Sequence, residues 1–214
     1  MRKSISVLAL ILTLLTVSLL APRPVAGEVG RDALEYCSQL AFSTEEDFVT
    51  QGPEPADGNP IISDGDLLGL VQTPTGTQCA VCARNADLLA QTFDVPVDIG
   101  LDAADVLNVD AYLVAFSTEL DSPNLGQFTA GDLLITNGAI IPNQALTARW
   151  QVGYDLGLDA VHFVGDMENI RGFVDVAAKV SRDEWLSNLG RLPWPDRLRF
   201  VARAVGRRLP GRGV

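Results

Sequence analysis

The chain has few of the side chains on which most enzyme active sites are built. His162 is the only histidine among 214 residues, and there are only three cysteines. The sequence has no Gly-x-Ser-x-Gly nucleophile elbow, no His-Glu-x-x-His zinc helix and no glycine-rich phosphate loop. His162 alternates with apolar neighbours in residues 161–164, which favours a structural or surface role. The sequence therefore predicts no catalytic residue and favours a protein that is not an enzyme.

Basic residues are also scarce over most of the chain. Between residues 28 and 170 there are 23 acidic side chains against Arg31, Arg84 and Arg149. Phosphate contacts dominate the affinity of proteins for nucleic acids, so this acidic stretch excludes nucleic acid as a partner. An acidic surface could attract cations, although solubility outside the cell explains it more simply.

The apolar run at the start of the chain is shorter than the about 20 residues that a membrane-spanning helix needs. It covers residues 5–21, follows two basic residues and precedes the small residues 25–27. This three-part pattern is typical of a signal peptide, here residues 1–27, with an uncleaved anchor as the alternative. No cysteine follows the run, which argues against a lipoprotein anchor. The sequence therefore predicts a secreted or extracytoplasmic protein that could be held at the cell surface.

An exported protein reaches an oxidising compartment, where a disulfide is the default state of its cysteines. Cys37 could pair with Cys79 or with Cys82, and the sequence leaves both pairings open with one thiol left over. Cys79 and Cys82 also have the spacing of a redox motif or of half a zinc site. A structural zinc site needs four ligands, and only Cys37 and His162 could complete it. The disulfide is therefore the favoured interpretation.

Three short blocks of sequence occur twice in the same order. They are Ala-Phe-Ser-Thr-Glu at 41–45 and 115–119, Gly-Asp-Leu-Leu at 65–68 and 131–134, and Gly-Leu-Asp-Ala at 100–103 and 157–160. Thirteen identities in ordered blocks indicate an internal duplication, with residues 28–110 as the first β repeat and 111–176 as the second. The first copy is longer around residues 53–60 and 73–82, which are rich in turn formers and are predicted to be surface loops.

The same blocks resemble segments of uncharacterised exported bacterial repeat proteins. The resemblance extends over about residues 41–163 and depends on the three short motifs. It implies export and repeated β units. It implies no activity and no site residues.

Strand signals dominate within each copy. Residues 111–118 are apolar and β-favouring, and residues 132–141 predict a hairpin around Asn137-Gly138, a turn signal in which both central residues take positive φ. Such sheets need a partner layer to cover their edges and faces. The sequence therefore predicts a mainly β fold, with the two repeats packed as a β-sandwich and a pair of propeller-like blades as the alternative.

Other segments are less regular. Residues 160–164 and 172–176 are further predicted strands, whereas 86–91 and 144–150 fit a short helix and a strand equally well.

Residues 177–214 form a basic C-terminal tail. A short helix is predicted to start at residue 183, and apolar residues at helical spacing between arginines predict a basic amphipathic helix over 196–209. This helix could dock on an anionic surface such as lipid or cell-wall polymer, or on the acidic body of its own chain.

Five acidic positions recur in both copies. Calcium prefers several carboxylate and carbonyl oxygens, and extracellular modules often bind it weakly. The tentative calcium ligands are the three pairs Asp66 and Asp132, Asp98 and Asp155, and Asp102 and Asp159. The calcium loop of EF-hands is absent, and aspartate is also a common turn residue because its side chain binds nearby backbone N–H groups. The structural role is therefore the favoured explanation, and calcium is the only predicted cofactor.

These features predict a secreted or cell-surface binding or structural module that is not catalytic and that calcium could stabilise. The alternative, from a different class, is an extracellular hydrolase that uses paired carboxylates.

Overall fold

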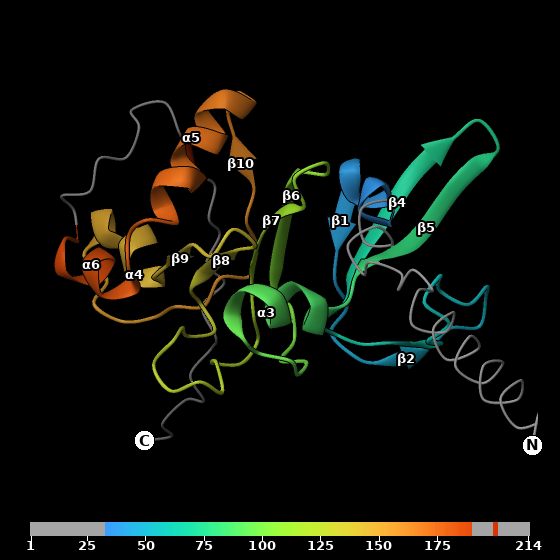
Figure 1. Ribbon diagram of the computed structural model, residues 1–214, viewed down its shortest axis with the longest axis horizontal. Helices are drawn as coiled ribbons and strands as arrows, with labels where there is room; N and C mark the ends of the chain where they lie inside the picture. Colours follow the sequence, from blue (N-terminus) through green and yellow to red (C-terminus); the bar gives the residue numbers. More distant parts are fainter. Residues whose placement is uncertain (1–32, 190–198, 201–214) are drawn as a thin grey trace, which may run out of the picture.

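The computed structural model describes residues 33–189 and 199–200 of the chain. Its sheets are open and antiparallel and its helices are few, which confirms the mainly β prediction (Figure 1). The predicted signal peptide lies outside the described residues. None of the described helices is long and apolar enough to cross a membrane.

The first sheet has three strands. They are β1 (Leu40–Phe42), β4 (Leu67–Thr73) and β5 (Gly76–Ala83), in the order β1-β4-β5. The prediction of a loop over 73–82 is wrong, because β4 and β5 stay paired up to Thr73 and Gly76. The turn formers occupy only the tip, and the following Thr, Gln, Cys and Val residues pair as a strand. The resulting hairpin projects from the body (Figure 1).

The segment between β1 and β4 contains the other long insertion of the first copy. The short strands β2 (Phe48–Val49) and β3 (Ile61–Ile62) pair with each other. Residues 53–60 between them contain no strand or helix, as predicted for a loop. After β5 the chain enters α3 (Asn85–Phe93), which decides the ambiguous segment 86–91 in favour of a helix.

The second sheet is a meander of four strands. They are β6 (Ala103–Asn108), β7 (Leu113–Ser117), β8 (Leu133–Ile135) and β9 (Ile140–Ile141). The predicted hairpin is present, but only Gly138 has positive φ, at +96°. Ile135 N donates to Ala139 O at 3.0 Å, so the loop has three residues, and a glycine at its third position suits this geometry. The ambiguous segment 144–150 forms α4 (Asn143–Leu146) and a short 3₁₀ helix, η2 (Ala148–Trp150).

The C-terminal part differs most from the sequence prediction. It contains β10 (Phe163–Val164), α5 (Met167–Ala177), α6 (Arg182–Ser187) and β11 (Arg199–Phe200). The predicted strand 172–176 is wrong, because buried residues recur at helical spacing in α5 and Asp166 caps its N-terminus through Asn169 N at 2.9 Å.

The predicted helix over 196–209 is also wrong at residues 199–200. Residues 199–200 form β11, which pairs with β10, and the rest of that segment lies outside the described residues. The short helix predicted to start at residue 183 is present as α6.

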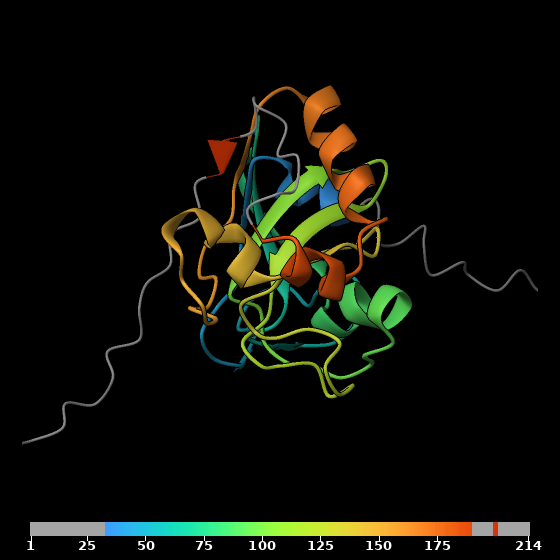
Figure 2. The ribbon, with the colours of Figure 1, turned by 90° about the vertical axis from the view of Figure 1, so that its left-hand side faces the viewer.

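Two clusters of buried apolar side chains form the core. One cluster joins the first sheet and α3 to one face of the second sheet, through Val114, Phe116 and Leu134. The other cluster joins the opposite face of the second sheet to α5 and α6, which lie in front of its strands in Figure 2. The second sheet is therefore covered on both faces.

Candidate functional site

Asp66, from the first Gly-Asp-Leu-Leu block, is almost completely buried, with 2% of its surface exposed. Its Oδ2 accepts hydrogen bonds from Ser63 N at 3.0 Å and from Arg84 Nη1 at 2.5 Å. Its Oδ1 accepts from Asn85 N at 3.3 Å. Donors of the protein itself therefore surround both oxygens, which a buried carboxylate requires.

Asp132, from the second copy of the same block, has matching surroundings and is 1% exposed. Its Oδ2 accepts from Thr129 N at 3.0 Å and from Arg182 Nε at 2.6 Å, and its Oδ1 accepts from Asn143 N at 3.1 Å. Asp132 Oδ1 also lies 2.9 Å from the Thr129 hydroxyl, and the source of the arginine differs. Arg84 directly precedes Asn85, whereas Pro142 stands before Asn143 and the guanidinium comes from α6, 50 residues away in sequence.

Arg84 also holds the long loop of the first copy. Its Nε lies 2.7 Å from Asp57 Oδ2, and its Nη2 lies 3.0 Å from Asp57 Oδ1. It donates further hydrogen bonds to the backbone oxygens of Asn59 and Ile61. The side-chain hydrogen bond between Arg84 and Asp57 is the largest cause of both of their pKa shifts. It lowers the pKa of Asp57 and raises the pKa of Arg84.

A buried asparagine completes each network. Asn85 Nδ2 donates to Gly100 O at 3.2 Å, and Asn85 Oδ1 accepts from Ile99 N at 3.0 Å. The second network repeats both hydrogen bonds, each at 3.0 Å, with Asn143, Gly157 and Leu156. Each asparagine therefore joins the start of the helix after the sheet to the backbone of the Gly-Leu-Asp-Ala block.

Asp98 and Asp155 belong to the same networks. Asp98 Oδ1 accepts from Gly100 N at 3.0 Å, and Asp155 Oδ1 accepts from Gly157 N at 2.9 Å. The other oxygen of each accepts from a hydroxyl, that of Ser63 in the first copy and, at 2.6 Å, that of Thr129 in the second. The structure thus brings Asp66 near Asp98, and Asp132 near Asp155, in each case across one hydroxyl-bearing residue.

The third predicted pair does not match in this way. Asp102 is half-buried, and its backbone N donates to Ser117 O at 3.3 Å. Asp159 is exposed. In the part of the chain that the structure describes, no group of three or more His, Cys, Asp or Glu side chains could hold a metal ion. Calcium binding at the six aspartates stays a prediction.

Gly65 and Gly131 leave the space that Asp98 and Asp155 occupy. A Cβ atom on Gly65 would overlap Asp98 Oδ1, and a Cβ atom on Gly131 would overlap Asp155 Oδ1 and lie 2.9 Å from Gly157 Cα. Neither glycine has positive φ, so the requirement is steric. This explains why the blocks begin with glycine.

Replacing Gly131 by alanine is therefore expected to lower the free energy of unfolding by about 2 to 3 kcal/mol, the usual cost of forcing atoms into a packed interior. Urea unfolding followed by circular dichroism measures this loss. The matched control is Gly153→Ala, since a Cβ atom there meets nothing within 4 Å. A Gly131→Ala variant as stable as the Gly153→Ala variant would show that the close approach to Asp155 is not required.

Several carboxylates crowd around Glu119, where the two copies of the repeated sequence meet. Burial is the main cause that raises the pKa of Glu119, and the negative charges of Asp64, Asp102, Glu45 and Asp98 raise it further. Burial, with Asp98 and Asp47, raises the pKa of Asp64 in the same way. Carboxyls with raised pKa lower the stability of the folded state as the pH rises through their titration range.

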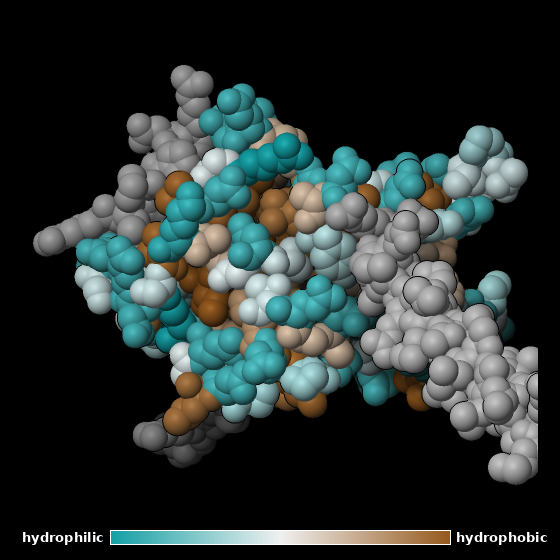
Figure 3. Space-filling model, in the orientation of Figure 1, coloured by the Kyte–Doolittle hydropathy of each residue, from teal (hydrophilic) through white to brown (hydrophobic). Residues whose placement is uncertain are grey.

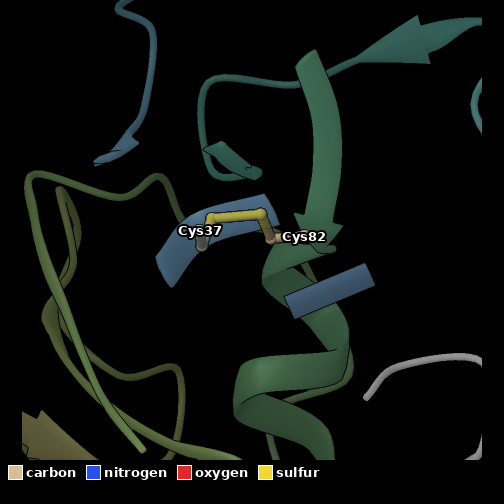
Figure 4. Close-up of a disulfide and its surroundings, with 2 residues drawn as sticks. All are labelled: Cys37 and Cys82. Carbon is tan, nitrogen blue, oxygen red and sulfur yellow. A yellow bond between two sulfur atoms is a disulfide. The ribbon is translucent and has the colours of Figure 1, made fainter. Parts of the chain in front are cut away.

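The cysteines resolve the pairing that the sequence left open. Cys37 of η1 (Glu35–Ser38) forms a disulfide with Cys82 of β5, with 6.2 Å between the Cα atoms (Figure 4). Cys79 is free and exposed. A disulfide is compatible with an extracytoplasmic protein.

His162 is 71% exposed, with its Nδ1 3.3 Å from Asp105 Oδ2.

Sequence reasoning missed the arginines and the role of the asparagines. Asn85 and Asn143 are identical at matching positions and could have been recognised as buried network residues. Arg84 could have been noticed because it is one of three basic residues in the acidic body. No sequence signal linked Arg182 to Asp132, because α6 lies outside the repeated blocks.

Comparison with protein-family models, with curated proteins and with solved structures found no match to this chain.

Proposed function

We propose that the chain is a secreted or cell-surface structural or binding module without catalytic activity, built from two copies of one β unit. The observation that carries this proposal is the use of the repeated carboxylates. Asp66 and Asp132 are buried, and each is held by an arginine and by backbone N–H donors. A carboxylate engaged in this way stabilises its own turn and is not available to a substrate.

The same contacts favour a structural role for these residues over calcium binding. A guanidinium already supplies the positive charge beside each buried aspartate. Hydroxyl and backbone N–H donors use the oxygens that a calcium ion would otherwise coordinate. In this proposal Arg84 and Arg182 take the place of the cation.

The proposed arrangement of the two copies is a sandwich in which the sheets form successive layers. It is supported by the apolar cluster that the first sheet and α3 share with one face of the second sheet. The alternative, a pair of propeller-like blades, is supported by the meander order β6-β7-β8-β9 of the second sheet. Matching hydrogen bonds at Asn85 and Asn143 support a duplication in either arrangement.

Export is proposed on three grounds. They are the signal-like residues 1–27, the disulfide, and the acidic composition of the chain, with a net charge of −11. The face drawn in Figure 3 is largely hydrophilic.

The second candidate is an extracellular hydrolase. The observation in its favour is the raised pKa of Glu119 beside other carboxylates, which is the pattern of an acid–base pair. The crowding of the same acidic side chains accounts for this shift without catalysis.

Melting curves in calcium and in EGTA, together with a polysaccharide-hydrolysis assay, test these proposals. We expect the same Tm in millimolar calcium and in EGTA, because the arginines already neutralise the buried aspartates. We also expect no release of reducing sugar. A rise in Tm that requires calcium would contradict the structural role of the aspartates. Hydrolysis that Glu119→Gln abolishes without a change in Tm would establish the hydrolase instead.

A further inference from the structure

The first sheet stands out in an acidic chain because its strands carry no charge. None of the residues in β1, β4 and β5 is acidic or basic, although the whole chain has a net charge of −11. A sheet face without charges is the surface on which two such chains repel each other least.

One face of this sheet is apolar, and we call it the outer face. The register pairs Phe42 with Leu68 and Leu68 with Val81, and it pairs Leu40 with Leu70 and Leu70 with Cys79. Residues directly opposite each other in neighbouring strands point to the same side of a sheet. The outer face therefore consists of Leu40, Phe42, Leu68, Leu70, Cys79 and Val81.

The outer face is only partly covered by the described residues. Leu40 is 50% exposed and Cys79 is exposed, whereas Phe42, Leu70 and Val81 are half-buried and Leu68 is buried, with 7% of its surface exposed. The tip of the β4–β5 hairpin beyond this face carries hydrophilic residues (Figure 3). The apolar surface is thus confined to the part of the hairpin nearer the body.

In the second sheet, the face that corresponds to the outer face is buried. Phe116 pairs with Leu134, as Phe42 does with Leu68, and both residues of the second sheet are 0% exposed. Phe93 of the first copy lies in the same apolar cluster, with its ring edge-on to that of Phe116 at 6.2 Å between centroids. In the second copy this face is therefore buried under another layer.

The outer face is open to solvent at Leu40 and Cys79. α3 and the inner side of the first sheet cover one face of the second sheet, and α5 and α6 cover the other. We propose that the outer face binds the same face of a second copy of this chain, about a two-fold axis. In such a contact each residue of the patch meets the patch of the partner copy, so an uncharged apolar surface is complementary to itself.

Sedimentation velocity over a range of protein concentrations tests this contact. The full chain carrying Cys79→Ser is used, so that any association is non-covalent. We expect a reversible dimer, and we expect Leu40→Glu to raise its dissociation constant at least tenfold, because two carboxylates would be buried in the contact. Leu125→Glu is the matched control, since Leu125 is fully exposed in a loop away from the first sheet and its change should leave the dimer intact.

The natural thiol offers a second measurement. Because Cys79 lies on the outer face, its reaction with N-ethylmaleimide in the unmodified chain should slow several-fold as the protein concentration rises. The variant Cys79→Asp changes only an exposed side chain and should abolish the dimer, without changing the melting curve at protein concentrations too low for the natural chain to associate. A chain that stays monomeric at all concentrations would overturn the proposal. So would a dimer that Leu40→Glu and Cys79→Asp leave unchanged.

Discussion

Replacing Asp132 by asparagine is expected to lower the free energy of unfolding by about 3 kcal/mol and the Tm by roughly 6 to 12 °C. The change removes the negative charge that neutralises Arg182, and it turns one acceptor oxygen into an amide that faces N–H donors. Thermal unfolding monitored by circular dichroism measures this loss. We expect it to be the same in calcium and in EGTA.

The matching substitution in the first copy, Asp66→Asn, should lower the free energy of unfolding by a smaller amount. Arg84 keeps Asp57 as a partner when Asp66 becomes asparagine, whereas the described part of the chain contains no second carboxylate paired with Arg182. We expect Asp66→Asn to be less destabilising than Asp132→Asn by about 1 kcal/mol. The control is Asp159→Asn, an exposed position at which the change should stay within about 0.5 kcal/mol.

A double-mutant cycle separates the ion pair from other effects of the substitution. Arg182→Gln should destabilise the natural chain but cost little more in the Asp132→Asn background, with a coupling of about 0.5 to 3 kcal/mol. Additive losses would show that Arg182 does not act through Asp132.

Replacing both Cys37 and Cys82 by alanine is expected to lower the free energy of unfolding by about 4 kcal/mol. The two cysteines are 45 residues apart, and closing a loop of that length removes this much conformational entropy from the unfolded chain. Both side chains are buried, so the loss of sulfur from the core adds to the effect. Urea unfolding of the two proteins measures the difference.

The third cysteine supplies the control for this prediction. Cys79→Ser should leave stability within about 0.5 kcal/mol of the natural chain, because this thiol is free and exposed. Reducing agent should destabilise the natural chain and the Cys79→Ser variant equally, and should have no effect on the double alanine variant. A large loss in Cys79→Ser would mean that Cys79, not Cys82, pairs with Cys37 in solution.

Much of the fold could be read from local patterns. The strand around residues 113–117 and the hairpin around Gly138 follow from side chains within a few positions of each other. The same local reading failed at residues 172–176, because the window was too short to show that buried residues recur every three or four positions along α5. It failed again at residues 76–83, where pairing with β4 outweighs the turn-forming composition.

The candidate site was predicted in part. Repetition drew attention to the aspartates, and the structure brings four of the six into two matching networks. Their burial was not predicted, because the sequence does not show which turn faces the core. Arg182 was missed because it lies 50 residues from its partner and outside the repeated blocks.

Features that depend on near neighbours in the chain follow from local sequence alone. These are the strand character of the chain, the loop over 53–60, the glycine of the β8–β9 turn and the placing of aspartates in turns. The three-dimensional packing sets which aspartates are buried, which arginine neutralises each of them and which cysteine pairs with Cys37. These outcomes depend on residues far apart in the chain, which the packing of the sheets and helices brings together.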